Sequence, residues 1–291
     1  MVVVLVVLGP GVGRAQLGTA VNVARHRLRY RSLTAAQGNP LGLQSDLMLG
    51  YRYRLWDRPG VLYRDSFAGA MAIARLNPAY ARLGAGAELR PLAVLTLRAL
   101  YEHRLYFSTF NMMQSFASPR DAYSDDDLSR RGEAGENYAG HGHEITLQAE
   151  LRAKVGPVAL LDDFNAVYFG MDLRGGDRLF YVNLFDTLCP NNRFTLINHG
   201  HLLYITSFGL IAGVRHSVVH ALYPEAWGNP NTPHHRLGPM LLYVFGDRGP
   251  SFRQPTLIVI VNWWIGNRYR SGSALPYGVL AFQFAGDLWT S

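Results

Sequence analysis

Long stretches of the chain alternate between apolar and polar residues. From His141 to Val155 the even positions are polar or glycine, and the odd positions from Ile145 onward are apolar. A helix repeats every 3.6 residues and would break this alternation within about four residues, whereas a strand sustains it. The same period of two runs from Leu43 to Leu55, with an exception at Ser45, and from Ala93 to Phe107. These segments are therefore predicted to be strands with one apolar and one polar face.

The length of these strands indicates the environment they occupy. Strands in soluble proteins usually have about 5 to 6 residues, whereas a tilted strand that crosses a bilayer needs about 9 to 11. The runs 43–55, 93–107 and 141–155 are longer still. Two-faced strands of this length fit a barrel with lipid outside and a wet interior, and the aromatic residues near one strand end, Tyr53 and Trp56, fit its interfacial girdle.

The segments between the strands fall into two classes. Short breaks rich in turn-forming residues occur at 57–60, 90–91 and 156–157. Longer polar segments occur at 32–41, 108–140 and 223–235. Short turns at one end and long loops at the other are the arrangement of an outer-membrane barrel. In a compact soluble domain, a loop as long as 108–140 is uncommon unless it has secondary structure of its own.

The count of strands has one internal conflict. Single-chain bacterial barrels have even strand numbers, whereas the pattern gives thirteen segments. The weak region is 178–222, where a turn at Phe208-Gly209 conflicts with the alternation of loops and turns. We predict an all-β fold, a closed antiparallel transmembrane β-barrel of about twelve strands, with fourteen as the alternative. The thirteen segments are 17–31, 42–56, 61–76, 79–90, 92–107, 141–155, 157–171, 178–188, 194–207, 209–222, 236–246, 255–267 and 275–289.

Composition excludes several other classes. The mean hydropathy is −0.00, and the longest apolar runs, 202–214 and 257–266, are too short for membrane helices. The net charge is +7, and of 28 basic residues only Lys154 is a lysine. The arginines are scattered, so the charge does not indicate a nucleic-acid partner, and none is predicted. The single cysteine, Cys189, excludes an intramolecular disulfide and a multi-cysteine zinc site.

The first sixteen residues resemble the later part of a secretory signal. An apolar core from Val2 to Leu8 is followed by a Gly/Pro break and a small residue at Ala15. The positive segment that normally precedes such a core is missing, so either the start codon is misplaced or this segment is a first strand. We favour the signal, which divides the chain into a signal peptide at 1–16 and a barrel at 17–291.

With this pattern the chain resembles bacterial outer-membrane β-barrel proteins as a broad class, over nearly all of the sequence after the signal. No local motif assigns it to a particular family. The resemblance implies location in the outer membrane of a Gram-negative cell, contact with outer-membrane lipid and lipopolysaccharide, and insertion by the barrel assembly machinery. One departure is the C-terminus, where Trp289 is followed by Thr290 and Ser291, whereas such proteins typically end on an aromatic residue.

The polar faces of the strands predict the lining of the lumen, which carries both signs of charge. If these charges pair across strands, the barrel is mainly structural; if basic residues remain unpaired, the lumen attracts small anions. Twelve strands enclose a modest interior. A small or selective porin-like channel or a structural barrel is therefore the predicted function. The predicted lumen-facing residues are Arg52, Arg54, Arg98, Glu102, Arg104, Glu144, Gln148, Glu150, Arg152 and Lys154.

Candidate metal sites are weak. His141-Gly142-His143 and His199-Gly200-His201 each place two imidazoles on one strand face, about 6.5 to 7 Å apart, but a metal site needs three or four converging ligands. The first pair shares a face with Ile145 and is expected to point outward. The acidic residues of the long loop, from Asp125 to Glu136, do not have EF-hand spacing. No metal and no cofactor are predicted.

An enzyme is the alternative of a different class. A lipid-active outer-membrane hydrolase, of the phospholipase or lipid A deacylase type, needs a base within reach of a nucleophile. His216 and Ser217 are adjacent and point to opposite faces of a strand, while His199 and Ser207 are eight residues apart. No triad emerges, so no catalytic residue is predicted. A second alternative is a soluble all-β binding protein.

Overall fold

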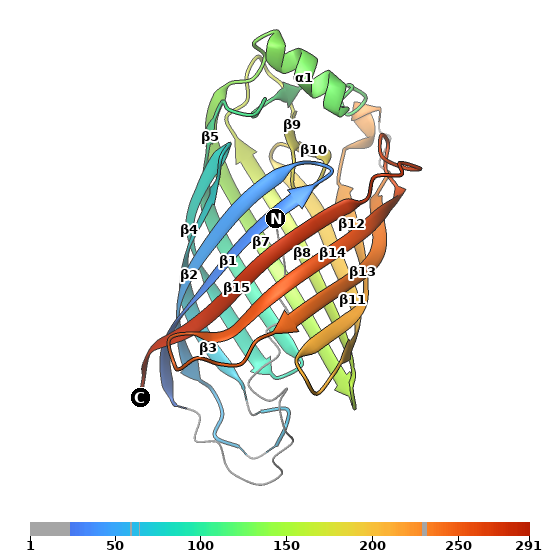
Figure 1. Ribbon diagram of the computed structural model, residues 1–291. Helices are drawn as coiled ribbons and strands as arrows, with labels where there is room; N and C mark the ends of the chain where they lie inside the picture. The colour runs from blue at the N-terminus through green and yellow to red at the C-terminus, as the bar shows by residue number, and fades with distance from the viewer. Residues whose placement is uncertain (1–23, 59, 64, 229–231) are drawn as a thin grey trace.

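Twelve antiparallel strands close into a barrel in the computed structural model, which describes residues 24–58, 60–63, 65–228 and 232–291 (Figure 1). The first and last strands, β1 and β15, pair to close it. The predicted closed all-β barrel of twelve strands is confirmed. Its strands are β1 (His26–Gly38), β2 (Gly42–Arg54), β3 (Phe67–Asn77), β4 (Tyr80–Leu92), β5 (Leu95–Phe107), β7 (Ala139–Val155), β8 (Val158–Met171), β11 (Arg193–Ile205), β12 (Leu210–Ala221), β13 (His234–Val244), β14 (Arg253–Gly266) and β15 (Tyr277–Thr290).

The two ends of the barrel differ. We call the end with the tight turns at 93–94, 156–157 and 206–209 the turn end. The opposite end, which we call the cap end, has the long connections from β5 to β7 and from β8 to β11. Figure 1 shows the helix α1 (Asp125–Glu133) above the cap end. The two longest connections thus lie at the cap end, as predicted. The division is incomplete, because tight turns at 39–41 and 78–79 also lie there and the connection 55–66 lies at the turn end.

Three predicted boundaries are wrong. The strand predicted at 61–76 begins only at Phe67, so the short break predicted at 57–60 is part of a longer connection from 55 to 66. Strand β1 continues to Gly38, so most of the loop expected at 32–41 is strand, and its turn is confined to residues 39–41. Leu33 and Ala35 sustain the inward alternation, and every residue from His26 to Gln37 has a partner in β2. The break expected at 90–91 lies inside β4, because Pro91 falls where the register with β5 shifts, and a bulge tolerates a residue without an N–H. Residues 1–23, which include the predicted signal, lie outside the described residues.

The segment 178–188, predicted as a thirteenth barrel strand, has another role. It forms β9 (Leu179–Val182) and leads into β10 (Thr187–Pro190), which make a separate three-stranded sheet with β6 (Ser115–Phe116). Strands of four residues are too short to cross a bilayer. Their side chains are buried, and Phe180 packs edge-on against Phe169 of the barrel wall, with ring centroids 5.1 Å apart. Phe208-Gly209 is then the β11–β12 turn at the turn end, which removes the conflict in the count.

The loop 108–140 is ordered around this small sheet. The helix α1 begins at Asp125 because the Ser124 side chain caps it and forms a capping box with Asp127. Gln114 donates to the Leu128 carbonyl over 2.7 Å, and the Arg131 guanidinium lies 4.3 Å from the Phe116 ring centroid. We call β6, β9, β10 and α1 together the cap. No helix in the described part of the chain has the length and apolarity needed to cross a bilayer.

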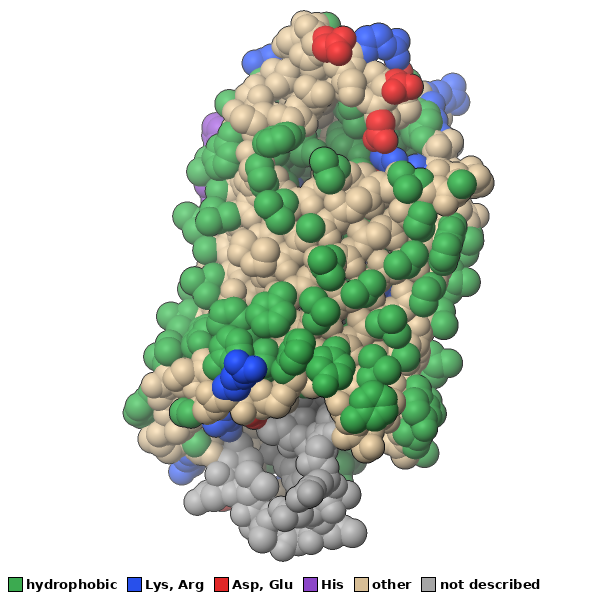
Figure 2. All heavy atoms as spheres, in the orientation of Figure 1, with side chains coloured by type: hydrophobic (Ala, Val, Ile, Leu, Met, Phe, Trp, Pro, Cys, Tyr) green, Lys and Arg blue, Asp and Glu red, His purple; other side chains and the backbone are tan. Residues whose placement is uncertain are grey.

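The outer surface of the barrel is apolar. Leu160, Leu202 and Leu280 are each more than half exposed, while the polar residues that alternate with such positions are buried. Figure 2 shows hydrophobic side chains spread over the flank and charged ones gathered toward the ends. Near the cap end the His143 ring stacks between those of Tyr101 and Tyr168. This distribution is the reverse of that in a soluble protein.

Burial of Cys189 in the cap gives a test of the fold. Its side chain is fully buried in β10, and this burial raises the pKa of the thiol to about 12. Because the thiolate is the reactive form, maleimide at pH 8 is expected to leave Cys189 of the folded protein unmodified while it labels the denatured chain completely. Mass spectrometry of both samples measures this, and equal labelling of the two would contradict the packing of the cap.

Candidate functional site

The inward face of the barrel has two unlike walls. The charged wall is formed by β2, β3, β4, β5 and β7 and carries arginines, glutamates and aspartates. The apolar wall is formed by the strands from β11 to β15. Its buried inward residues include Ile197, Leu203, Ile211, Val219, Met240, Leu242, Ile258, Ile260, Val279 and Ala281. Charged residues are fewer on this second wall, where Arg215, Arg236 and Asp287 lie buried among the apolar side chains.

The first ionic cluster of the charged wall is centred on Glu144. Its carboxylate accepts from the Arg82 guanidinium, 3.2 Å to each oxygen, and also from Arg104. Arg104 donates in addition to the Tyr106 hydroxyl at 2.8 Å. The two arginines are 1% and 0% exposed. A single carboxylate therefore balances two guanidinium groups that have no access to bulk water.

A second cluster lies nearer the turn end. Glu88 accepts from Arg52 and, over 3.0 Å, from Arg98. Arg98 also lies 3.6 Å from Glu150, which pairs with Arg152 as well. Each carboxylate thus serves two arginines, so cations outnumber anions in this part of the lumen.

The structure separates the ten predicted lumen residues into three groups. Six belong to the two clusters. A seventh, Gln148, contacts the second cluster, since it accepts from Arg98 over 2.9 Å and donates to Asp163. Glu102 pairs instead with Arg75 at 3.0 Å. The remaining two lie outside the clusters, since Arg54 pairs with the exposed Asp57 at 2.9 Å and Lys154 is exposed at the end of its strand.

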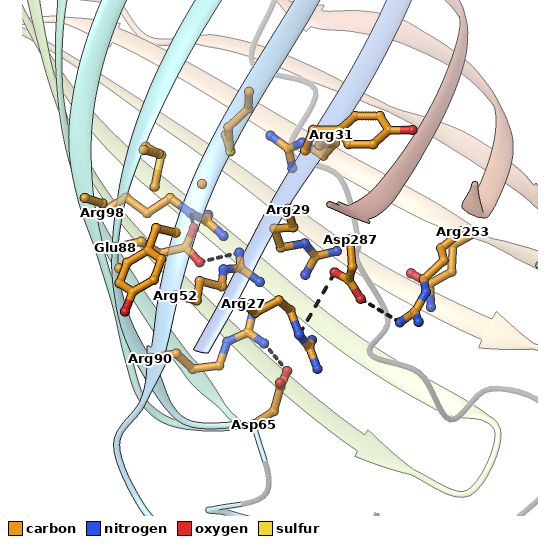
Figure 3. Close-up of a pocket in the computed structure, with 18 of the residues that line it drawn as sticks. Arg27, Arg29, Arg31, Arg52, Asp65, Glu88, Arg90, Arg98, Arg253 and Asp287 are labelled. Atoms are coloured by element: carbon orange, nitrogen blue, oxygen red, sulfur yellow. Dashed lines mark hydrogen bonds and ion pairs between the residues drawn. The ribbon is translucent and has the colours of Figure 1, made fainter. Parts of the chain in front are cut away.

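A cavity of about 80 Å³ opens beside the second cluster (Figure 3). Strands β1, β2, β3, β4, β5, β7, β14 and β15 contribute to its lining. Eight arginines and four carboxylates lie around it: Arg27, Arg29, Arg31, Arg52, Arg90, Arg98, Arg152 and Arg253, with Asp65, Glu88, Asp247 and Asp287. We call it the arginine cavity.

Two of its arginines contribute to the excess of positive charge without a partner among the described residues. Asp287 is shared by Arg253 at 2.8 Å and Arg27 at 4.0 Å. Within the described residues, Arg29 and Arg31 make no hydrogen bond and no ion pair. Both are half-buried, and Figure 3 shows their guanidinium groups directed into the cavity. Their positive charge is therefore available to a negatively charged ligand.

The sequence contains a signal for these arginines that our strand assignment did not use. Residues 27–31 read Arg-Leu-Arg-Tyr-Arg, a strict alternation that places three guanidinium groups on one face of a strand. The predicted strand 17–31 contains these arginines, but the set of predicted lumen residues does not include them. The Asp287 and Arg253 positions depend on the pairing of β15 with β1 and β14, which no local pattern specifies.

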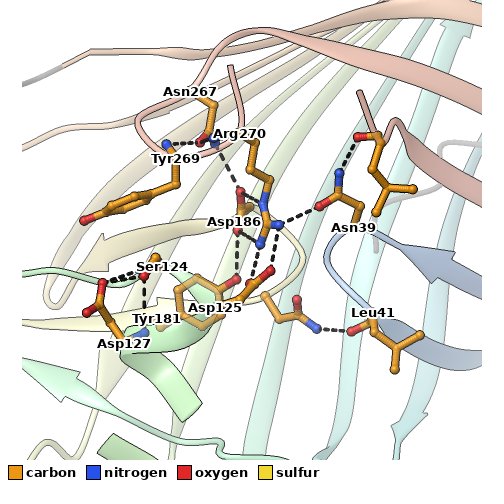
Figure 4. Close-up of polar contacts among 12 residues, drawn as sticks. Asn39, Leu41, Ser124, Asp125, Asp127, Tyr181, Asp186, Asn267, Tyr269 and Arg270 are labelled. Atoms are coloured by element: carbon orange, nitrogen blue, oxygen red, sulfur yellow. Dashed lines mark hydrogen bonds and ion pairs between the residues drawn. The ribbon is translucent and has the colours of Figure 1, made fainter. Parts of the chain in front are cut away.

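A second polar site fastens the cap, and we call it the cap latch (Figure 4). Arg270, in the connection from β14 to β15, donates to Asp125 of α1 over 2.6 and 3.0 Å and to Asp186 over 2.6 and 3.0 Å. It also donates to Asn39 in the β1–β2 turn over 2.5 Å. The hydrogen bonds and charges of the two aspartates raise the pKa of Arg270 above its ordinary value. One guanidinium thus joins four connections at the cap end.

The candidate histidines and serines do not form a catalytic arrangement. Cross-strand register places Asp163, His199 and Ser217 in one row on the inward face. Asp163 hydrogen-bonds to Gln148 and Asn165, and the Ser217 hydroxyl accepts from Arg215 over 3.0 Å. No hydrogen bond joins the three within the described chain. His216 faces outward, away from Ser217, as the alternation predicts.

Clusters of three or more possible metal-ligating side chains are also absent from the described residues. His199 and His201 point inward, toward the charged and polar groups of β12. His141 is exposed on the outer surface. The acidic residues of α1 are used for capping and for the cap latch.

Comparison with known proteins gives structural likenesses at low identity. No family model matches the sequence, and no curated protein matches it. The chain is similar to the β-domain of the Bordetella autotransporter BrkA, with 11% identity and a TM-score of 0.43 over 89% of this chain and 99% of that one. It is also similar to the translocator domain of autotransporter NalP from Neisseria meningitidis, with 12% identity and a TM-score of 0.40 over 93% of this chain and 88% of that one. A third similar structure is Pseudomonas aeruginosa OccD3 (OpdP), with 13% identity and a TM-score of 0.33 over 95% of each chain.

Proposed function

We propose that this chain is an outer-membrane β-barrel that acts as a porin-like, selective channel for small anions. The membrane placement is supported by the apolar outer surface, on which leucines are more than half exposed while most charged residues of the strands face inward. Such a surface is unfavourable in water and favourable in hydrocarbon. With this placement we propose three partners, which are outer-membrane lipid, lipopolysaccharide and the barrel assembly machinery.

The arginine cavity is the observation that carries the anion selectivity. Eight arginines against four carboxylates give an excess of positive charge, and Arg29 and Arg31 are directed into the cavity without partners among the described residues. Charges that are half-buried are screened less by salt than exposed ones. Side chains lining a lumen set its selectivity, so the cavity favours chloride, phosphate or small carboxylates over cations.

Planar-bilayer recording with a salt gradient tests this proposal. The purified protein is expected to give conductance steps with a reversal potential on the anion-selective side. Replacing both partnerless arginines, Arg29→Gln with Arg31→Gln, is expected to lower the chloride-to-potassium permeability ratio about threefold or more, because the excess charge in the lumen falls.

Lys154→Gln is the matched control for the double variant. It removes one positive charge at the same end of the barrel, but from an exposed position outside the arginine cavity. Its permeability ratio is expected to equal that of the unmodified protein. Cation-selective steps, or an equal effect of the control and the double variant, would overturn the assignment to this cavity.

A further inference from the structure

A group of polar side chains interrupts the apolar outer surface on β8, β11, β12 and β13. Asn198 donates to both carboxylate oxygens of Asp162, over 3.0 and 3.1 Å. The rings of His216 and His235 stack with centroids 5.5 Å apart, and Nε2 of the first lies 3.4 Å from Nδ1 of the second. These four residues and Gly200, which lies between them, form what we call the lateral patch.

The surroundings of the lateral patch are apolar. Its four polar side chains are each half-buried, and strongly exposed hydrophobic residues surround them. This argument rests on the membrane placement proposed above: ionisable groups facing hydrocarbon are costly and usually meet a partner. The surrounding residues are Leu160, Phe164, Leu202, Val214 and Leu237, which are 39–56% exposed.

Gly200 makes the centre of the patch flat. It pairs across the sheet with Asp162 on one side and His216 on the other. A Cβ at this position would meet only Asp162 Oδ1, at 3.7 Å, so neither close packing nor backbone strain requires a glycine here. Small residues at membrane interfaces allow two protein backbones to approach closely. The glycine therefore separates a carboxylate–amide pair from an imidazole pair by a strip without side chains.

We propose that the lateral patch is the interface with a second copy of this chain. Two copies inserted in the same direction are related by a two-fold axis parallel to the barrel axis, and such an interface is self-complementary. With the axis beside Gly200, the His216 ring of each copy faces the Asp162–Asn198 pair of the other. Carboxylate and imidazole then meet twice across the axis.

Cysteine cross-linking tests the position of the axis. A residue beside a two-fold axis lies close to its own copy, so Gly200→Cys is expected to form a disulfide-linked dimer on mild oxidation in liposomes. Ala72→Cys is the matched control, since Ala72 is exposed on the outer face of β3, several strands away on either path around the barrel. The buried Cys189 is common to both variants. Cross-linking of Gly200→Cys no stronger than that of the control would overturn the proposal.

A second measurement does not depend on cysteine chemistry. His216→Ala is expected to raise the dimer dissociation constant in detergent about tenfold, as loss of a polar contact within a membrane typically does. Light scattering and native mass spectrometry measure the oligomeric state. A monomer throughout, or a monomer carrying lipopolysaccharide or another protein on this face, would overturn the proposal. Flotation of the protein with vesicles reports separately on the membrane placement, so the two failures are distinguishable.

Discussion

Replacing Glu144 with alanine is expected to destabilise the barrel by about 3–5 kcal/mol, the range found when one partner of a buried ion pair is removed. The substitution leaves Arg82 and Arg104 without their shared carboxylate, and both guanidinium groups are almost fully buried. Most of this loss in the free energy of unfolding comes from leaving buried charge without a counter-charge, and less comes from the lost contacts themselves. Urea unfolding of the protein in liposomes, followed by tryptophan fluorescence, measures the change.

Glu136→Ala provides the comparison for Glu144→Ala. Glu136 also pairs with an arginine, Arg131 at 2.8 Å, but its side chain is 45% exposed and the partner's is 31% exposed. Exposed ion pairs contribute about 0 to 1 kcal/mol, so this variant is expected to unfold at nearly the same urea concentration as the unmodified protein. If the two variants lost equal stability, the Glu144 cluster would not have the stabilising role that its burial indicates.

Arg270→Ala is expected to loosen the cap without unfolding the barrel. It leaves Asp186, which is 3% exposed, without its main cation and frees α1 from the β14–β15 connection. A local loss of about 2–3 kcal/mol corresponds to a rise of roughly 30- to 150-fold in the rate at which the cap opens. Maleimide labelling of Cys189 in the folded protein reports this rate, because the thiol is buried in the cap.

Two further variants identify the cause of faster labelling. Arg270→Lys keeps the charge but cannot donate to two carboxylates in the planar, forked manner of a guanidinium, so its labelling rate is expected to lie between those of alanine and arginine. Arg130→Ala removes an arginine of α1 that is 71% exposed and pairs only with Asp127. Its rate is expected to be unchanged. Equal rates for all variants would show that the cap is held by its apolar packing alone.

Alternation along the strands of the charged wall is what allows a prediction of the side chains that face the lumen. Glu144, Gln148 and Glu150 share one parity in a strand whose other parity is apolar, so the pattern itself specifies their face. The apolar wall has no such contrast: residues 257–261 read Leu-Ile-Val-Ile-Val, and both faces of this strand are hydrophobic. Periodicity therefore identified β14 as a strand but did not show which residues line the lumen.

The arginine cavity and the cap latch depend on long-range pairing. Arg29 and Asp287 are placed together by the register of β1 with β15, at opposite ends of the chain. Arg270 meets Asp125 and Asp186 because three loops converge at one end of the barrel. The pattern of residues within a single strand or loop does not predict either of these contacts. The same limitation accounts for the wrong prediction at 178–188. This segment is largely apolar and resembles a barrel strand, and only the tertiary structure shows that it packs in the cap.

The division of the interior into two walls also divides the chain in sequence. Residues 42–155 form the charged wall, while the strands from Arg193 to Thr290 form the apolar one. In the unfolded chain, the strands of the earlier half have one polar and one apolar face, whereas the later half contains the segment 257–261, which is apolar on both faces. Segments of this kind are the most prone to aggregate when a chain is unfolded, so aggregation of the unfolded protein is expected to begin in the later half.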